Sequence, residues 1–136
     1  MSGENLSTVA DFTPLLAGGA LDIVQIQGQR TGITGALQIA SLAQAFDLPV
    51  TVNNSPGHFM AHVAAALPNH LMTEVVVAEH DGVMRTGIAV EDGHVVLDDA
   101  PGLGIELDEQ ALAGHRMGIT PLPIPGGRAP RGGLTL

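Results

Sequence analysis

The first 78 residues alternate between helical and strand-like spacings of apolar positions. Residues 20–27 and Val50–Asn53 are short runs whose apolar positions recur every second residue, which predicts strands. Residues 34–46 carry apolar side chains every three to four positions, which predicts a helix. Residues 58–66 are apolar nearly all round, as in a helix covered on several sides, and residues 71–78 predict a third strand.

The first two predicted strands separate apolar from polar side chains. Val24 and Ile26 fall on one face of the first strand, and Gln25 and Gln27 fall on the other. The second strand repeats this alternation and ends at Asn53. Polar groups therefore gather where these strands stop, which is where α/β barrels place their chemistry.

A short helix is expected ahead of the first strand. Ser7 and Thr8 are candidate N-caps, and Gly18 and Gly19 end the helix. Pro14 either kinks this helix or begins a new one in its first turn.

Strands that alternate with helices at this spacing predict parallel pairing through right-handed crossovers, and hence an α/β fold. Three strands cannot close a barrel, so the expected sheet is open. An open parallel sheet exposes two strand edges and apolar side chains, and hiding them requires assembly with another copy or another chain.

The pattern changes after residue 80. Asp-Gly pairs at Asp81 and Asp92 lie between alternating runs, which predicts hairpin turns. Residues 113–136 are rich in Gly and Pro, which predicts an extended tail that needs another surface to lie on. The chain thus divides into residues 1–80, 81–112 and 113–136.

Composition excludes several classes of function. The chain has 136 residues, which is one domain or part of one, and it is 45% hydrophobic and 14% charged, as in globular proteins. The net charge of -9 argues against nucleic acid or an anionic membrane as partner. Cysteines, a leader segment and a long apolar run are all absent from the sequence, so we expect a cytoplasmic protein.

The histidines do not form a zinc-ligand pattern. His62 lies within an apolar helix and is expected to bond to backbone or to a neighbour. The other histidines named here fall in predicted loops or in the hairpin region and are expected to be exposed: His70, His80, His94 and His115.

Four segments taken together resemble the enolase superfamily, in its mandelate racemase and muconate lactonizing branch. They are SGEN (residues 2–5), LDIVQIQGQRTGITGALQIASLAQAFDLPV (21–50), HVAAALPNHLMTE (62–74) and PGLGIELDE (101–109). The resemblance covers residues 2–112. It implies the C-terminal part of a (β/α)7β TIM-like barrel, from the end of the fifth strand to the eighth. Residues 81–112 would then return to a capping domain that is missing, together with strands one to four.

The resemblance also implies a Mg2+ site and a small carboxylate substrate. Glu4 matches the third metal carboxylate, and the remaining ligands would come from the missing N-terminal half. Glu74 matches an acid that acts as electrophile toward the enediolate formed when a base removes the proton α to the carboxylate.

The positions that carry the base in this family differ here. Gln27 stands where the sixth strand carries Asp or Lys, and Asn53, or Asn54 if the loop shifts by one, stands where the seventh strand carries His. None of the three can act as general base. Asn53 and Gln25 are expected to contact substrate instead.

Each of these residues also has a structural interpretation. Glu4 could be solvated, Glu74 could be a surface residue at a strand end, and Asn53 and Asn54 could hold a turn. Gln25 and Gln27 could pack in the interior of a barrel.

Three hypotheses follow. The first is the C-terminal part of a Mg2+-dependent racemase, cycloisomerase or acid-sugar dehydratase, inactive alone, with Met1 marking a truncated reading frame or a fragment. The second is a non-catalytic half-barrel remnant that acts as an oligomerising structural or binding module. The third is one half of a split enzyme that joins a complementary N-terminal half.

Overall fold

The computed structural model describes residues 1–53, 59–75 and 82–114. The elements follow in the order α1 (Val9–Ala17), β1 (Val24–Gln27), α2 (Gly28–Ala45), β2 (Val50–Asn53), α3 (Met60–Ala66), β3 (His70–Thr73), β4 (Met84–Thr86), β5 (Ile88–Glu91), β6 (His94–Leu97), β7 (Ile105–Leu107) and α4 (Glu109–Gly114). Predictions that lie outside the described residues concern Asn54, His58, residues 76–78, His80, Asp81 and residues 115–136.

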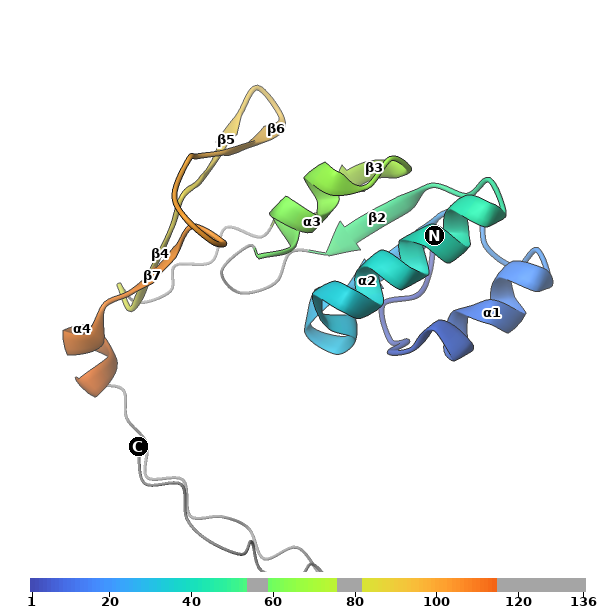
Figure 1. Ribbon diagram of the computed structural model, residues 1–136, viewed down its shortest axis with the longest axis horizontal. Helices are drawn as coiled ribbons and strands as arrows, with labels where there is room; N and C mark the ends of the chain where they lie inside the picture. Colours follow the sequence, from blue (N-terminus) through green and yellow to red (C-terminus); the bar gives the residue numbers. More distant parts are fainter. Residues whose placement is uncertain (54–58, 76–81, 115–136) are drawn as a thin grey trace, which may run out of the picture.

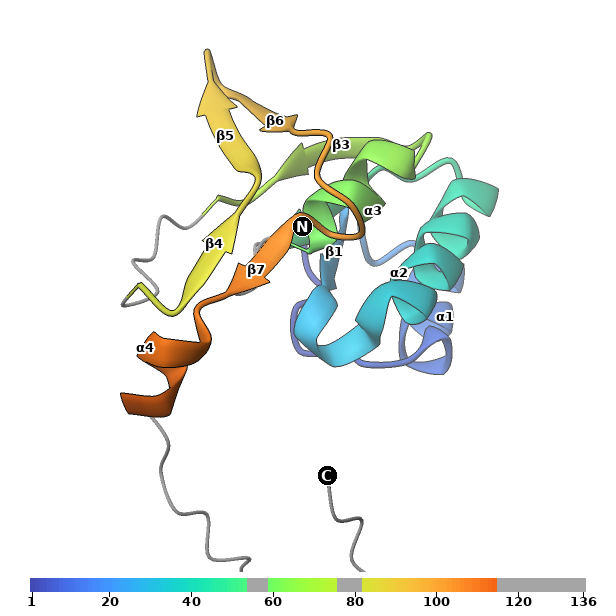
Figure 2. The same cartoon turned by 60° about the vertical axis from the view of Figure 1, so that its left-hand side comes forward.

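A parallel three-stranded sheet with the order β1-β2-β3 organises the first 75 residues, as the alternation of helices and strands predicts. Val24 pairs with Val50 and Gln27 pairs with Asn53 in β1 and β2. Ser2 forms an isolated parallel bridge with Val24, so the N-terminal segment lies beside β1 like a further strand (Figure 2).

One hydrophobic core joins this sheet to its helices, and we call residues 1–53 and 59–75 the body (Figure 1). Ile26 and Val52 are fully buried, and they occupy the same face of the sheet because they pair in register. The other core residues come from α1, α2, α3 and the same two strands: Phe12, Leu16, Val24, Ala36, Ile39, Ala40, Ala43, Val50, Met60, Val63 and Ala64.

Helix α1 begins with a capping box. Thr8 accepts a hydrogen bond from the Asp11 N–H, and the Asp11 carboxylate accepts one from the Thr8 N–H at 2.8 Å. Gly18 ends the helix, as expected. Pro14 lies inside α1, so it does not begin a new helix.

The structure corrects the bounds of the predicted strands. Residues 20–23 lie outside β1, because β2 begins opposite Val24 and leaves them without a strand to pair with. Strand β3 ends at Thr73, since β2 ends at Asn53 and the shared ladder stops there. The bounds of β2 agree with the prediction.

The structure corrects the start of the helix predicted over residues 34–46. Helix α2 begins at Gly28, directly after β1, and its helical geometry breaks at Gly32. Gly32 has φ 62° and ψ -179°, a conformation that is open essentially to glycine alone.

Residues 82–107 form two separate antiparallel ladders, β4 with β7 and β5 with β6, which we call the arm. The arm and α4 project away from the body in both views (Figures 1 and 2). Asp92 and Gly93 both have positive φ, 49° and 76°, so they form the predicted hairpin turn between β5 and β6. Strand β4 pairs with the distant β7, a pairing that the Asp-Gly signals do not predict.

Candidate functional site

A row of polar side chains lies at the carboxyl ends of the three parallel strands. Gln27 and Asn53 are register partners in β1 and β2. The Glu74 N–H donates to the Val52 carbonyl oxygen at 3.0 Å, a bond of the Val52–Thr73 pair, so Glu74 directly follows the last paired residue of β3 as Asn53 follows Val52 in β2. The fold therefore brings Gln27, Asn53 and Glu74, three of the predicted site residues, to one edge of the sheet.

Asn53 is the best-anchored member of this row. The residue is 4% exposed, and its Oδ1 accepts a hydrogen bond of 2.9 Å from Gln25 Nε2 on the neighbouring strand. The two residues are 28 positions apart in sequence. Gln25 and Asn53 are the two residues expected to contact substrate, and the structure joins them directly.

Gln27 lies on the same face as Gln25, one alternation further toward the strand end. Its Oε1 is enclosed and has no hydrogen-bond partner within the described part of the chain. A buried acceptor without a donor is costly and rare in folded proteins.

Glu74 is exposed and follows β3 directly, rather than lying inside an apolar strand as predicted. Both interpretations of Glu74, as an electrophile and as a surface residue, place it at the end of a strand. The observed position is compatible with either interpretation.

Glu4 follows the N-terminal segment that pairs with β1. Gly3, the residue before it, has φ 133°, and a Cβ atom there would collide with the Gln25 carbonyl oxygen and the Phe12 ring. The backbone at this position is thereby fixed against β1, while the Glu4 side chain itself is exposed.

The residues present do not make a magnesium site by themselves. Within residues 1–53, 59–75 and 82–114, no three His, Asp or Glu side chains lie close enough to hold a metal ion. Mg2+ requires near-octahedral oxygen ligation, and Glu4 offers one carboxylate.

The row is built to hydrogen-bond rather than to remove protons. Gln25, Gln27 and Asn53 carry neutral amides that cannot accept a proton at neutral pH. The structure describes four candidate residues on β1 and β2 or directly after β3: Gln25, Gln27, Asn53 and Glu74. Of these, only Glu74 has a titratable side chain.

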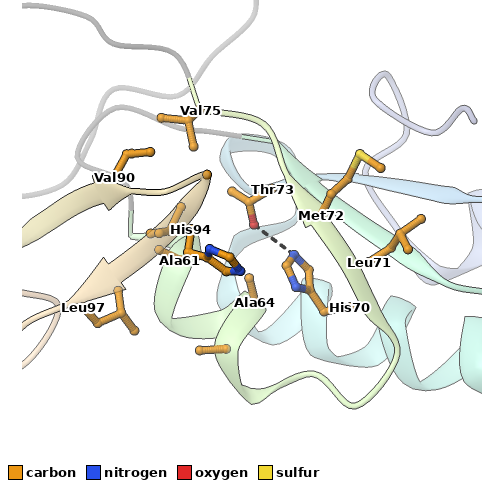
Figure 3. Close-up of a pocket in the computed structure, with 13 residues that line it drawn as sticks. Ala61, Ala64, His70, Leu71, Met72, Thr73, Val75, Val90, His94 and Leu97 are labelled. Carbon is orange, nitrogen blue, oxygen red and sulfur yellow. Dashed lines mark hydrogen bonds between the residues drawn. The ribbon is translucent and has the colours of Figure 1, made fainter.

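A separate cavity of about 460 Å3 lies where the arm meets α3 and β3 (Figure 3). It is lined largely by apolar side chains, with His70 and His94 among them. None of the predicted site residues that the structure describes lines it. The cavity is therefore distinct from the row at the strand ends.

Two histidine predictions have different outcomes. His62 is structural as expected, because its Nε2–H donates to the Leu103 carbonyl oxygen at 3.2 Å and ties α3 to the arm. The prediction of an exposed loop histidine at His70 is wrong: it begins β3, is half-buried and shares a hydrogen bond of 2.9 Å with Thr73 Oγ1 (Figure 3). His94 is exposed in the hairpin, as expected.

Among the described residues, no helix is long and apolar enough to cross a membrane.

Comparison with known proteins places these observations in context. A family model described as "Enolase C-terminal domain-like" matches residues 1–111. D-xylonate dehydratase from Haloferax volcanii is 32% identical over 121 residues, which cover 83% of this chain and 29% of that protein. The chain thus spans less than a third of the length of this relative.

Solved structures give the same result. The mandelate racemase/muconate lactonizing enzyme from Jannaschia sp. CCS1 is 34% identical with a TM-score of 0.74, and the match covers 85% of this chain and 31% of that one. A Burkholderia xenovorans LB400 protein, whose structure is bound to magnesium and fumarate, is 28% identical with a TM-score of 0.71, over 82% and 30% of the two chains.

Proposed function

The chain belongs to the enolase superfamily, in its mandelate racemase and muconate lactonizing branch, and on that premise we propose that it forms one side of an active site that removes the proton α to a carboxylate. Its fold is the C-terminal part of the superfamily's TIM-like barrel. The reaction type that we propose is an acid-sugar dehydration or a racemisation.

One observation carries this proposal. The register of β1, β2 and β3 aligns Gln27, Asn53 and the Glu74 position at the carboxyl ends of parallel strands. Barrel enzymes assemble their active sites at this end, because loops from several strands converge there. The dehydratase and racemase names of the relatives support the reaction class.

In the proposed site the chain binds and orients the substrate. The Gln25–Asn53 pair presents a fixed amide edge to the substrate, and Glu74 acts as electrophile, donating a hydrogen bond to the developing enediolate when it carries a proton. The base comes from a segment outside this chain, since the amides of Gln27 and Asn53 cannot accept the proton.

The proposal includes Mg2+, for which this chain supplies only part of the ligand set. Glu4 is the one residue that we assign to it, and the further ligands come from another part of the barrel. The magnesium in the Burkholderia xenovorans structure supports this assignment.

Complementation tests the function. The 136-residue chain, alone or co-expressed with the N-terminal two-thirds of the Haloferax volcanii relative, is incubated in D2O with D-xylonate and Mg2+, and α-proton exchange is followed by NMR. We expect exchange in the complemented protein and none in the chain alone.

Glu74→Ala tests the role of the acid within the same assay. It should reduce the rate about 100-fold or more, as loss of a transition-state donor does, while exposed Glu91→Ala on the arm leaves the rate unchanged. Absence of exchange in every pairing would overturn the enzyme proposal.

A second function, an oligomerising half-barrel module without catalysis, is favoured by a different observation. Leu71 and Met72 on β3 are 50% and 53% exposed, and β3 has no strand on its outer side among the described residues. Light scattering coupled to size-exclusion chromatography tests it. A soluble monomer with a cooperative melting transition would count against this module.

A further inference from the structure

We propose that the cavity between the arm and the body binds a small uncharged molecule with an apolar body and one hydroxyl group, a phenol or an apolar alcohol. The ligand hydroxyl donates a hydrogen bond to His94 Nε2. This site uses none of the residues of the row at the strand ends, so the inference goes beyond the proposed function and does not depend on it.

The first support is the size and the composition of the cavity. Its volume of about 460 Å3 falls within the range of about 300–1,000 Å3 that is usual for small-molecule sites. Most of its lining consists of alanine, valine, leucine and methionine side chains. Benzene fits an apolar cavity of about 150 Å3, so a substituted aromatic ring or an aliphatic chain of similar size fits here.

The second support is the lack of fixed charge around the cavity. The chain has 14 acidic and 5 basic residues, but no Asp, Glu, Lys or Arg is among the described residues that line this space. An ionic ligand would therefore enter an apolar site without a permanently charged partner, which is costly. An uncharged ligand avoids that cost.

The third support is the hydrogen-bonding state of His94. Its Nδ1 lies 3.0 Å from the Asp92 carbonyl oxygen. A carbonyl oxygen can only accept, so Nδ1 carries the hydrogen, and Nε2 of the neutral ring is an acceptor. No hydrogen bond joins His94 Nε2 to the described part of the chain. The ring projects from the arm toward His70 across the cavity (Figure 3), where a ligand hydroxyl supplies the missing donor.

The polar groups on the opposite wall are already engaged with each other. His70 Nε2 and Thr73 Oγ1, both on β3, share a hydrogen bond of 2.9 Å (Figure 3). The acceptor that the arm presents is therefore left for the ligand, and a single hydroxyl group on an otherwise apolar molecule matches it.

The position of the cavity gives ligand binding a structural consequence. Its lining comes from α3 and β3 of the body and from β5 and β6 of the arm. A molecule bound there contacts both regions at once and holds the arm against the body. Opening of the arm should then be suppressed by the factor 1 + [L]/Kd that applies to any ligand of the closed state alone.

The test compares ligands that share one apolar body. The complete chain is titrated with p-cresol, with its methyl ether, which has no hydroxyl donor, and with the anion p-toluate, and Kd values are measured by NMR. We expect p-cresol to bind about tenfold more tightly than either, the size of one hydrogen bond. In His94→Phe, which keeps a ring and removes the acceptor, the ratio of p-cresol to its ether should fall to within about twofold.

Two neighbouring residues of α3 provide a matched pair of variants. Ala65 and Ala66 are both exposed, but only Ala65 lines the cavity. Ala65→Phe should fill the space and weaken p-cresol about tenfold or more, whereas Ala66→Phe should retain the parent affinity.

Amide hydrogen exchange supplies a second readout. With p-cresol at ten times its Kd, amides of β5 and β6 should exchange about tenfold more slowly in the parent chain. They should be unaffected in Ala65→Phe at the same ligand concentration.

Four results overturn the inference: no saturable binding of p-cresol, equal binding of its methyl ether, a ratio that survives in His94→Phe, or tighter binding of p-toluate. The last would assign the cavity to an anion held by a protonated histidine. Absence of α-proton exchange in the complemented protein overturns the proposed function alone, because the cavity shares no residue with the row.

Discussion

In the body, side chains of β1, β2 and their three helices form one buried core, whereas no apolar side chain of the described arm is buried. The difference arises from layering. The body covers one face of a three-stranded sheet with helices, while the arm consists of two-stranded ladders, which are marginal in isolation because they have no second layer. Val90, Val96 and Leu107 of the arm remain 41–57% exposed.

The comparison teaches that the two regions owe their structure to different interactions. Hydrophobic burial holds the body together. Backbone pairing and turn geometry hold the arm, for example through the Gly87 N–H to the Gly104 carbonyl oxygen at 2.9 Å. The candidate row at the strand ends therefore lies on the region with the buried core, while return of the arm to a capping domain stays a prediction.

Amide hydrogen exchange should give the largest contrast. Amides of β1 and β2 should exchange through openings that cost nearly the free energy of global unfolding, about 5 kcal/mol or more. Amides of β5 and β6 should exchange through openings that cost about 0–2 kcal/mol. NMR-detected exchange measures both in one sample. Equal protection in the two regions would refute the comparison.

Truncation of a core side chain comes next. Phe12 is fully buried, so Phe12→Ala should destabilise the protein by about 3–5 kcal/mol, measured by urea unfolding. The control Val96→Ala removes an exposed side chain on the arm and should change stability by less than about 0.5 kcal/mol. A large effect of Val96→Ala would show that the exposed side chains of the arm are packed after all.

Adding one carbon atom sharpens the comparison. A Cβ atom on Gly28 would press on Met60 and the Phe59 ring, so Gly28→Ala should cost about 1–3 kcal/mol through overpacking. Gly114→Ala in α4 meets nothing within 4 Å and serves as the matched control, with an effect near zero. A Gly28→Ala variant as stable as the parent would mean that this contact is loose.

The smallest effect is expected at the capping box. Thr8→Ala should cost about 1 kcal/mol, measured by chemical denaturation at neutral pH, because the N-cap acceptor of α1 is lost.

The same capping box should make stability depend on pH. Hydrogen bonds from the Thr8 side chain and from the Thr8 and Ser7 N–H groups lower the pKa of the Asp11 carboxyl below 3.8. The stabilisation is therefore complete above that pH and is lost as the pH falls through the lowered value. Asp11→Asn should flatten this part of the pH profile, and an unchanged profile would contradict the assignment.

Prediction from sequence succeeded where a signal is local. Two-residue alternation predicts β2 with its correct ends, the Asp92-Gly93 pair predicts the hairpin turn, and the Thr8 cap predicts the start of α1. It failed where a strand's length depends on its partner. β1 and β3 are shorter than their apolar runs because β2, with four residues, limits both ladders.

The sequence likewise predicts some features of the candidate site and not others. The residue types at Gln27, Asn53 and Glu74, and their occurrence near strand ends, follow from the pattern of the sequence. The partners of those side chains do not, because no short-range signal indicates that Gln25 bonds to Asn53 or that Gln27 Oε1 is left without a donor.

The sequence by itself determined the α/β class, the positions of the turns and the neutral chemistry of the strand ends, because backbone preferences and side-chain types act within a few residues. Only the tertiary structure decided which of those groups are buried, paired or left unsatisfied. Such contacts join residues far apart in the chain, as in the pair Gln25 and Asn53, and they form only once parallel strands are in register.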